Sequence, residues 1–253
     1  MLLAVDVGNT RIKVAVFEDT ILLERFVFPN ESLGENILII LKKHPNTTDL
    51  VVASVGNIEK TAFLSFENQL NIHFLTSDSV FPFSNLYATP ETLGIDRMVL
   101  ASGAVLQYPK QNRLVIDAGT CVTYDFIDDQ DQYLGGAITP GIRMRYESLH
   151  HFTAKLPLLT LEDYLKSQKE SESIKMIGNS TPDSIHSGVL NGLTYEIDGF
   201  IEQHRQEYPK FIIILTGGDA DFLANRLKNT IFANSNFLLE SLNQTFQYQI
   251  KND

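Results

Sequence analysis

The 253-residue chain has few features of secreted or membrane proteins. Its single cysteine, Cys121, excludes an internal disulfide and is typical of a protein in a reducing compartment. The first residues, MLLAVDVGNT, lack the basic n-region of a signal peptide, and no apolar run approaches the roughly 20 residues that span a membrane. These absences predict a soluble cytoplasmic protein with no membrane partner.

Basic residues are also few. Only 20 lysine and arginine residues oppose 31 aspartate and glutamate residues, which gives a formal net charge of −11. This negative surplus repels nucleic-acid backbones, so it predicts no direct nucleic-acid partner. It also repels ATP at long range, so a nucleotide site in this chain would need local attraction from backbone amides and a metal ion.

Four common catalytic motifs are missing from the chain. It contains no G-x-x-x-x-G-K-[ST], no G-x-G-x-x-G, no G-x-S-x-G and no H-E-x-x-H. P-loop kinases, dinucleotide enzymes, α/β-hydrolases and zinc proteases of the H-E-x-x-H type therefore lose support.

Two segments of the chain, 2–19 and 114–129, follow one design. Each is an apolar run that ends in Asp-x-Gly and is followed by a threonine and a second β-rich run. The pattern predicts a strand, a tight turn and an antiparallel strand. Because the pattern occurs twice, at Asp6 and at Asp117, the sequence favours two duplicated halves.

The residues of the first turn suit phosphate and metal binding. Gly8 lets backbone amides approach a ligand closely, and Asn9 and Thr10 add side-chain donors. Asp6 could hold Mg²⁺ directly or through water, and strand alternation places Lys13 on the ligand side. Taken alone, this segment is equally typical of an ordinary hairpin. The second copy, with Asp117 and Thr120, favours a two-sided grip on a triphosphate.

Apolar periodicity predicts strands and helices that alternate along the chain, as in α/β proteins. The predicted strands beyond the two turns are 21–28, 50–55, 71–75, 133–138 and 211–215, and the predicted helices are 33–44, 60–70, 94–107, 141–154, 183–205 and 219–227. Pro109 follows the predicted helix at 94–107 and marks a boundary, which divides the chain into domains 1–109 and 110–253. The glycine pair in Thr216–Gly218 would allow close approach of a flat base or a ribose.

Together these motifs resemble a known superfamily. Asp6–Thr10, Asp117–Thr120 and Thr216–Gly218 are similar to the phosphate-1, phosphate-2 and adenosine motifs of actin-like (ribonuclease H-like) ATPases. Within that superfamily, the chain resembles type III pantothenate kinases at GIDR (94–97), GGAITPG (135–141), FTAKLP (152–157) and NSTPDSIHSG (179–188). The resemblance implies an α/β fold of two duplicated actin-like halves around an ATP cleft.

The resemblance also implies a reaction, the ATP-dependent phosphorylation of pantothenate to 4′-phosphopantothenate, the first step of coenzyme A biosynthesis. It makes Asp96 the base, Asp117 the ligand of a monovalent cation (K⁺ or NH₄⁺), and the active form a homodimer with Mg²⁺ as a further cofactor. The implied pantothenate contacts are Tyr87, Gly94, Ile95, Asp96, Arg97 and Thr181. The implied ATP contacts are Asp6, Val7, Gly8, Asn9, Thr10, Arg11, Ile12, Lys13 and Thr120.

The residues alone leave alternatives open. Asp96 by itself is a first-turn acid of a predicted helix, where the helix dipole would make it a weaker base. Arg97 could bind the transferring phosphoryl group or the substrate carboxylate. Two other functions also remain: a regulatory or accessory protein on the same fold, and a kinase of the same superfamily with another small-molecule substrate.

Overall fold

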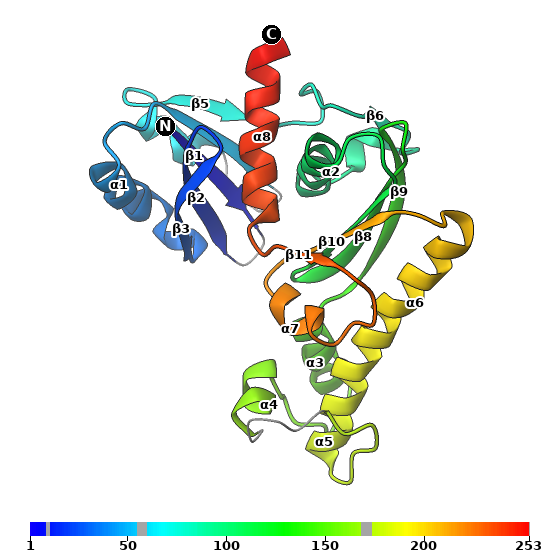
Figure 1. Cartoon of the computed structure of the whole chain (residues 1–253). Coiled ribbons are helices and arrows are strands. Elements are labelled where there is room, and N and C mark those ends of the chain that lie inside the picture. The colour runs from blue at the N-terminus through cyan, green and yellow to red at the C-terminus, as the bar shows by residue number, and fades with distance from the viewer. Residues whose placement is uncertain (9–10, 55–59, 168–173, 253) are drawn as a thin grey trace. The chain divides into compact units, whose positions relative to one another are not determined.

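The computed structural model describes residues 1–8, 11–54, 60–167 and 174–252. Strands and helices alternate along the chain and form two sheets, which confirms the predicted α/β class (Figure 1). The chain forms two compact units: the first consists of Met1–Val115, Asp125–Gly135 and Asn236–Asp253, and the second of Ile116–Tyr124 and Gly136–Ser235. No helix within the described residues is long and apolar enough to cross a membrane.

These units differ from the predicted division into 1–109 and 110–253. The C-terminal segment Asn236–Asp253 belongs to the first unit, and so does Asp125–Gly135. Sequence order could not reveal this, because a segment joins a unit through its packing and not through its position in the chain.

The sheet of the first unit contains five strands in the order β3-β2-β1-β4-β5. They are β1 (Leu2–Val7), β2 (Ile12–Glu18), β3 (Ile21–Phe28), β4 (Asp49–Ser54) and β5 (Asn71–Phe74). β2 runs antiparallel to β1, as predicted, and β4 runs parallel to β1. In the β1–β2 pair, Asp6 lies opposite Lys13.

The two faces of β1 have different roles. Leu3, Val5 and Val7 point into a core that also includes residues of α1 (Leu33–Lys43) and of the 3-10 segment Lys60–Phe66. Because successive side chains alternate, Asp6 lies on the opposite face of the strand. The helix that the sequence predicted at 60–70 is shorter in the structure, where it is the 3-10 segment Lys60–Phe66.

Two helices of the first unit pack on each other, α2 (Ile95–Gln107) and α8 (Phe237–Asn252), and α8 also contacts β1 (Figure 1). A Cβ atom on Gly103 of α2 would overlap the side chain of Ser241 of α8, so the glycine allows the helices to approach closely. Thr245 Oγ1 donates a hydrogen bond to Ser102 Oγ at 2.7 Å. Helix α8 was not predicted from the sequence.

The second sheet has the order β11-β10-β7-β8-β9-β6. Its strands are β6 (Ser84–Asn85), β7 (Arg113–Ala118), β8 (Cys121–Ile127), β9 (Gln132–Pro140), β10 (Ile212–Thr216) and β11 (Phe232–Ala233). The boundary between the two units falls inside β7, β8 and β9.

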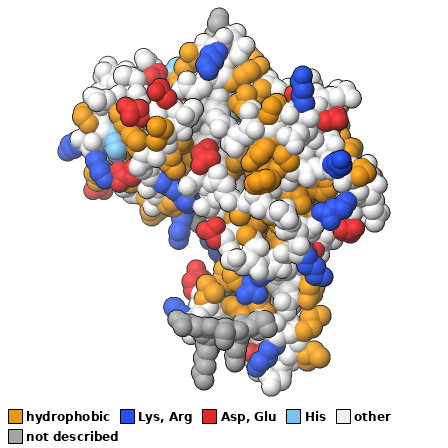
Figure 2. Space-filling view, in the orientation of Figure 1, with side chains coloured by type: hydrophobic (Ala, Val, Ile, Leu, Met, Phe, Trp, Pro, Cys, Tyr) orange, Lys and Arg blue, Asp and Glu red, His pale blue; other side chains and the backbone are white. Residues whose placement is uncertain are grey.

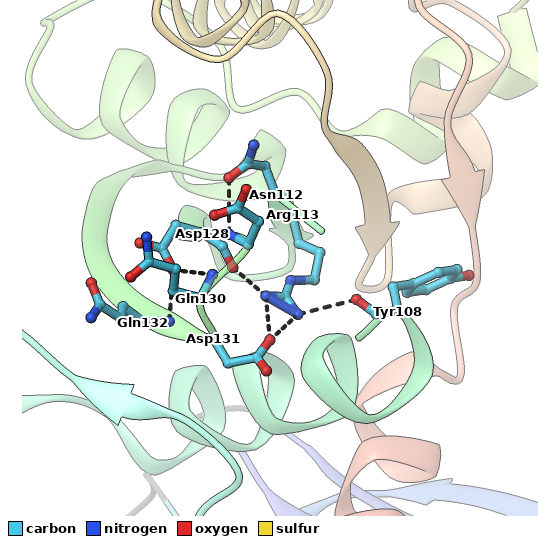
Figure 3. A network of polar contacts seen from close by, with 8 residues as sticks. Tyr108, Asn112, Arg113, Asp128, Gln130, Asp131 and Gln132 are labelled. Carbon is cyan, nitrogen blue, oxygen red and sulfur yellow. Dashed lines mark hydrogen bonds and ion pairs between the residues drawn. The ribbon is translucent and has the colours of Figure 1, made fainter. Parts of the chain in front are cut away.

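A buried arginine fixes the turn between β8 and β9 (Figure 3). Arg113, which is fully buried, donates from Nη1 and Nη2 to Asp131 Oδ1, both at 2.7 Å, and from Nη1 to Tyr108 O at 3.1 Å. Its Nη2 also donates to Asp128 O. The ion pair with Asp131 and these hydrogen bonds offset the cost of burying the arginine charge in the interior of the first unit.

The remaining helices lie in the second unit: α3 (Ile142–His151), α4 (Leu161–Ser167), α5 (Thr181–His186), α6 (Gly192–Glu207) and α7 (Ala220–Ala224). The predicted helix 183–205 is divided by a π-helical turn at Ser187–Asn191. Its buried residues Ile185, Val189 and Leu193 recur every four positions, which is more than the 3.6 residues of an α-helical turn. The wider π turn offsets that drift and keeps the apolar residues on one face.

Candidate functional site

The first Asp-x-Gly turn follows β1. Asp6 has only 4% of its surface exposed, and its Oδ2 atom lies 3.6 Å from Nζ of Lys13. The amide of Gly8 donates a hydrogen bond to the carbonyl oxygen of Arg11 at 3.2 Å. Arg11 is exposed. The predicted contacts Asn9 and Thr10 lie outside the described residues.

Two other predicted ATP contacts of this turn lie in the interior. The side chains of Val7 and Ile12 are completely buried in the core of the first unit. If they contact a nucleotide, they do so through backbone atoms, which is how glycine-containing turns commonly bind phosphate.

The buried Asp6 carboxylate is electrostatically linked to Asp96. Burial raises the pKa of Asp6 to about 6, the charge of Lys13 opposes that rise, and the charge of Asp96 adds to it. Two carboxylates and one ammonium group of the first unit therefore share a local field. A divalent cation would be favoured there, because it would relieve the repulsion between the carboxylates.

Helix α2 begins at the GIDR segment, with Gly94 as the N-cap residue. Asp96 Oδ1 accepts a hydrogen bond from the Arg97 amide at 2.8 Å. Burial raises the pKa of Asp96, and the opposing effects of the Arg97 amide and charge do not cancel it. The amides at the helix start and the nearby cations do lower the pKa of Asp96, as expected, but burial outweighs them, so the net shift is upward.

Arg97 and Tyr87 lie against each other in the first unit. The Arg97 guanidinium carbon is 5.7 Å from the centre of the Tyr87 ring. Arg97 also forms an ion pair with Asp125 of β8, in which Nη2 is 2.7 Å from Oδ1. The Tyr133 hydroxyl donates to the same oxygen at 2.5 Å.

Sequence reasoning missed Asp125 and Tyr133. A signal was present, because Asp125 stands between Tyr124 and Phe126 in a strand whose other residues, apart from Thr123, are apolar or aromatic. An acidic residue in such a strand is rarely buried without a partner. That partner, Arg97, lies 28 residues away in the sequence. Only the tertiary fold brings the two side chains together.

A cavity of about 470 Å³ adjoins the start of α2. Its lining in the first unit includes Gly94 and Ile95 of the GIDR segment and residues at the carboxyl ends of the parallel strands β4 and β5, among them Ser54 and Phe74. Ligands of α/β proteins commonly bind at the carboxyl ends of parallel strands, and the volume suits a small molecule.

The second Asp-x-Gly turn is packed between two glycines of the second unit. The Gly141 amide donates to Thr120 O at 3.1 Å, and the Asp219 amide donates to Ala118 O at 3.0 Å. A Cβ atom on Gly141 would overlap Gly119 O and Thr120 O, and one on Gly217 would overlap the Ala118 carbonyl and Asp117 Oδ1. Gly217 therefore approaches this turn closely, and the predicted approach of a base or ribose to the glycine pair stays a prediction. The Thr120 side chain is exposed.

Replacement of Gly217 tests this packing. Gly217 has a φ of +98°, so Gly217→Ala combines backbone strain with overlap of the Ala118 carbonyl and the Asp117 side chain. We expect the free energy of unfolding to fall by about 2–4 kcal/mol, measured by denaturant titration. The matched control is Gly218→Ala, since nothing lies within 4 Å of the added Cβ. Equal stability of the two variants would contradict the packing described here.

A smaller cavity of about 280 Å³ lies beside this turn in the second unit, lined by Asp219, Glu162 and Tyr146 among others. Burial raises the pKa of Asp219 to about 6, and the charge of Glu162 adds to the rise. Folding therefore favours the protonated carboxyl. The contribution of Asp219 to the free energy of unfolding is fully present below the ordinary pKa of 3.8, and it is lost as the pH rises through about 6.

We accordingly expect Asp219→Asn, which mimics the protonated form, to raise the free energy of unfolding at pH 8 by up to about 3 kcal/mol. The gain should shrink as the pH is lowered towards 4, and urea titrations at both pH values measure it. The control is Asp221→Asn in the same helix, where the side chain is exposed and little change is expected. A gain that does not depend on pH would contradict this explanation.

Thr181, the last predicted substrate contact, is in the second unit at the start of α5. It lines a cavity of about 730 Å³ together with Leu149, Leu156 and Ser184. The structure thus groups Tyr87, Gly94, Ile95, Asp96 and Arg97 in the first unit, and Thr181 belongs to the other.

Comparison with known proteins agrees with the motifs. The family model for type III pantothenate kinase matches residues 2–203. A type III pantothenate kinase of Flavobacterium johnsoniae is 66% identical over 253 residues, with all of both chains covered (100%).

Two solved structures show the same fold. One is a Campylobacter jejuni protein described as a Baf family transcriptional activator, with a TM-score of 0.63, 21% identity, and coverage of 98% of this chain and 99% of that chain. The other is a ROK family protein of Streptococcus pneumoniae in complex with sucrose, with a TM-score of 0.54, 10% identity, and coverage of 100% and 99%. At these identities the likeness shows the fold alone, which is that of the actin-like ATPases and ROK kinases.

Proposed function

Because the chain belongs to the type III pantothenate kinase family, we propose that it transfers the γ-phosphoryl group of ATP to the primary hydroxyl of pantothenate. The product would be 4′-phosphopantothenate, and the reaction would be the first step of coenzyme A biosynthesis. The reactants and the single cysteine suit the cytoplasm.

One observation of the structure supports this reaction most directly. In the first unit, the turn after β1 and the start of α2 bring Asp6 and Asp96 close enough that the charge of Asp96 raises the pKa of Asp6. A phosphate-sized turn and a carboxylate beside a small-molecule cavity are what phosphoryl transfer to a hydroxyl needs.

Asp96 would accept the hydroxyl proton as the substrate oxygen attacks phosphorus. Its raised pKa makes it a better proton acceptor than an exposed aspartate, and its hydrogen bond to the Arg97 amide fixes its orientation. Phosphoryl transfer has a loose transition state, so orientation of the hydroxyl is as important as basicity.

The residues also fit the cations that the family implies. Asp6 would hold Mg²⁺ together with phosphate oxygens and water, since the described residues contain no cluster of three or more metal-ligating side chains. Asp117 would hold K⁺ or NH₄⁺, because its carboxylate and the carbonyls of Ala118 and Gly119 make this turn rich in oxygen. Bound there, the cations would offset the negative charge of the phosphates, and Thr120 and the turn amides would contact the γ-phosphate.

We also propose a homodimer. The second unit exposes large apolar side chains at Phe152 (81%), Met176 (68%) and Ile177 (84%). Figure 2 shows hydrophobic side chains at the surface of the part that contains α5 and α6. Burial of such residues against a second copy would stabilise the dimer.

We therefore expect the protein to sediment as a dimer at micromolar concentration and Ile177→Asp to sediment mainly as a monomer, because a charge would then be buried in the interface. Ile250→Asp is the control, since Ile250 is also exposed (55%) but lies at the end of α8 in the first unit. A monomeric parent protein would contradict the proposal.

The reaction is tested by coupled ADP release with and without pantothenate. We expect ADP release that depends on pantothenate. ADP release with another acceptor only would indicate a different kinase of the superfamily, and no release with any acceptor would indicate an accessory protein.

A further inference from the structure

Asp125 is a completely buried carboxylate that no sequence motif had singled out. A single oxygen, Oδ1, accepts hydrogen bonds from Arg97 Nε at 2.8 Å and from the Tyr133 hydroxyl at 2.5 Å, and it lies 2.7 Å from Arg97 Nη2 in the ion pair. A charge at such depth is tolerated only when it is paired and hydrogen-bonded. Asp125 and Arg97 are therefore a matched pair inside the first unit.

The same group of side chains also supports Tyr87. The ring of Tyr87 lies edge-on to the ring of Tyr133, with 6.1 Å between their centres, and Arg97 lies over the Tyr87 ring. Gly135 also lies beside the Tyr87 ring, since a Cβ atom there would be 3.5 Å from Tyr87 Cδ2, an ordinary packing distance. Two proposed substrate contacts, Arg97 and Tyr87, thus depend on the Asp125–Tyr133 pair.

The pairing changes what Arg97 offers a ligand. Burial alone would lower the pKa of Arg97, but the charge of Asp125 reverses that effect and raises the pKa above its ordinary value. The guanidinium is therefore charged, yet its charge is already balanced by a carboxylate at 2.7 Å. An arginine that stabilises a transferring phosphoryl group usually acts through charge that is not balanced in this way. A balanced guanidinium suits an uncharged hydroxyl or amide group.

We propose that Asp125, assisted by Tyr133, is a positioning residue that holds the Arg97 guanidinium and the Tyr87 ring in place to bind the uncharged polar part of pantothenate. This inference rests on the proposed function. Asp125 would contact neither substrate nor nucleotide and would act through Arg97.

The test is steady-state kinetics of Asp125→Asn, with the KM for pantothenate and the KM for ATP measured separately. Asparagine keeps the size of the side chain but removes the charge that holds Arg97. We expect the KM for pantothenate to rise about tenfold or more, the KM for ATP to change less than about twofold, and kcat to fall less than the pantothenate KM rises. Isothermal titration with pantothenate alone should show the same loss of affinity without turnover.

A second variant keeps the test decisive if Asp125→Asn does not fold. Tyr133→Phe retains the ring against Tyr87 and the Asp125–Arg97 ion pair, and it removes only the 2.5 Å hydrogen bond. We expect a smaller change in the same direction, with the pantothenate KM about threefold higher.

The matched control is Asp131→Asn. Asp131 pairs with Arg113, a second buried arginine of the first unit, through two contacts of 2.7 Å (Figure 3). Loss of this pair should lower the melting temperature, as loss of the Asp125–Arg97 pair should, but leave both KM values unchanged. The control separates general destabilisation from loss of substrate positioning.

A pantothenate KM that stays unchanged in both Asp125→Asn and Tyr133→Phe would overturn the inference and leave the proposed function intact. A fall in kcat with an unchanged pantothenate KM would also overturn it, since Arg97 would then act on the phosphoryl group. Absence of pantothenate-dependent turnover in the unsubstituted protein would overturn the proposed function, and the inference with it.

Discussion

Asp96→Asn should lower kcat by about 10²–10⁴-fold while the protein remains folded. Asparagine retains an oxygen that can accept the Arg97 amide hydrogen bond, but it cannot take a proton from the pantothenate hydroxyl. Because burial raises the pKa of Asp96, loss of its charge should leave the melting temperature equal or slightly higher. Coupled ADP release and thermal unfolding measure the two effects.

The control for this variant is Glu35→Gln, which removes the first-turn acid of α1, an exposed residue in the same unit. It should leave kcat unchanged. An Asp96→Asn protein with an unimpaired rate would remove Asp96 from the mechanism, whatever its stability.

Asp117→Ala is the second change with a large expected effect. In the unsubstituted protein, turnover should be higher in potassium than in sodium buffer, because K⁺ held by Asp117 would offset phosphate charge at the second turn. The variant should lose about 10²-fold or more in kcat and should respond equally to both cations. ADP release in matched potassium and sodium buffers provides the measurement.

Asp129→Ala serves as the control for Asp117→Ala, since it removes the same charge from an exposed position beyond β8. It should retain the dependence on potassium. Turnover of the unsubstituted protein that is independent of potassium would contradict the role of Asp117, and it would leave the proposal for Asp96 untouched.

Local patterns were sufficient for much of the fold. Continuous apolar runs before Asp6 and Asp117 predicted β1 and β7, and the strand at Ile21–Phe28 has the predicted bounds. These elements are determined by runs and patterns of apolar residues, which are local properties of the sequence. The helix at Phe237–Asn252 was not predicted, although its buried residues are what attach it to α2 and β1.

The candidate site shows the same division. The GIDR segment and the two Asp-x-Gly turns were recognised because their chemistry lies within four or five consecutive residues. The raised pKa of Asp96 was not foreseen, because burial depends on the neighbours that the fold supplies and outweighs the effect of the helix start. The partner of Arg97 was equally beyond sequence, since it comes from another element of the chain.

The sequence by itself determined the α/β class, the family and the residues that belong to the phosphate turns and to GIDR. Only the tertiary structure decided that Asp125 balances Arg97, that Gly141 and Gly217 enclose the second turn, and that the C-terminal helix completes the first unit. The physical reason is that strand periodicity and turn chemistry act between neighbours in the chain. Burial, charge pairing and close packing act between neighbours in space.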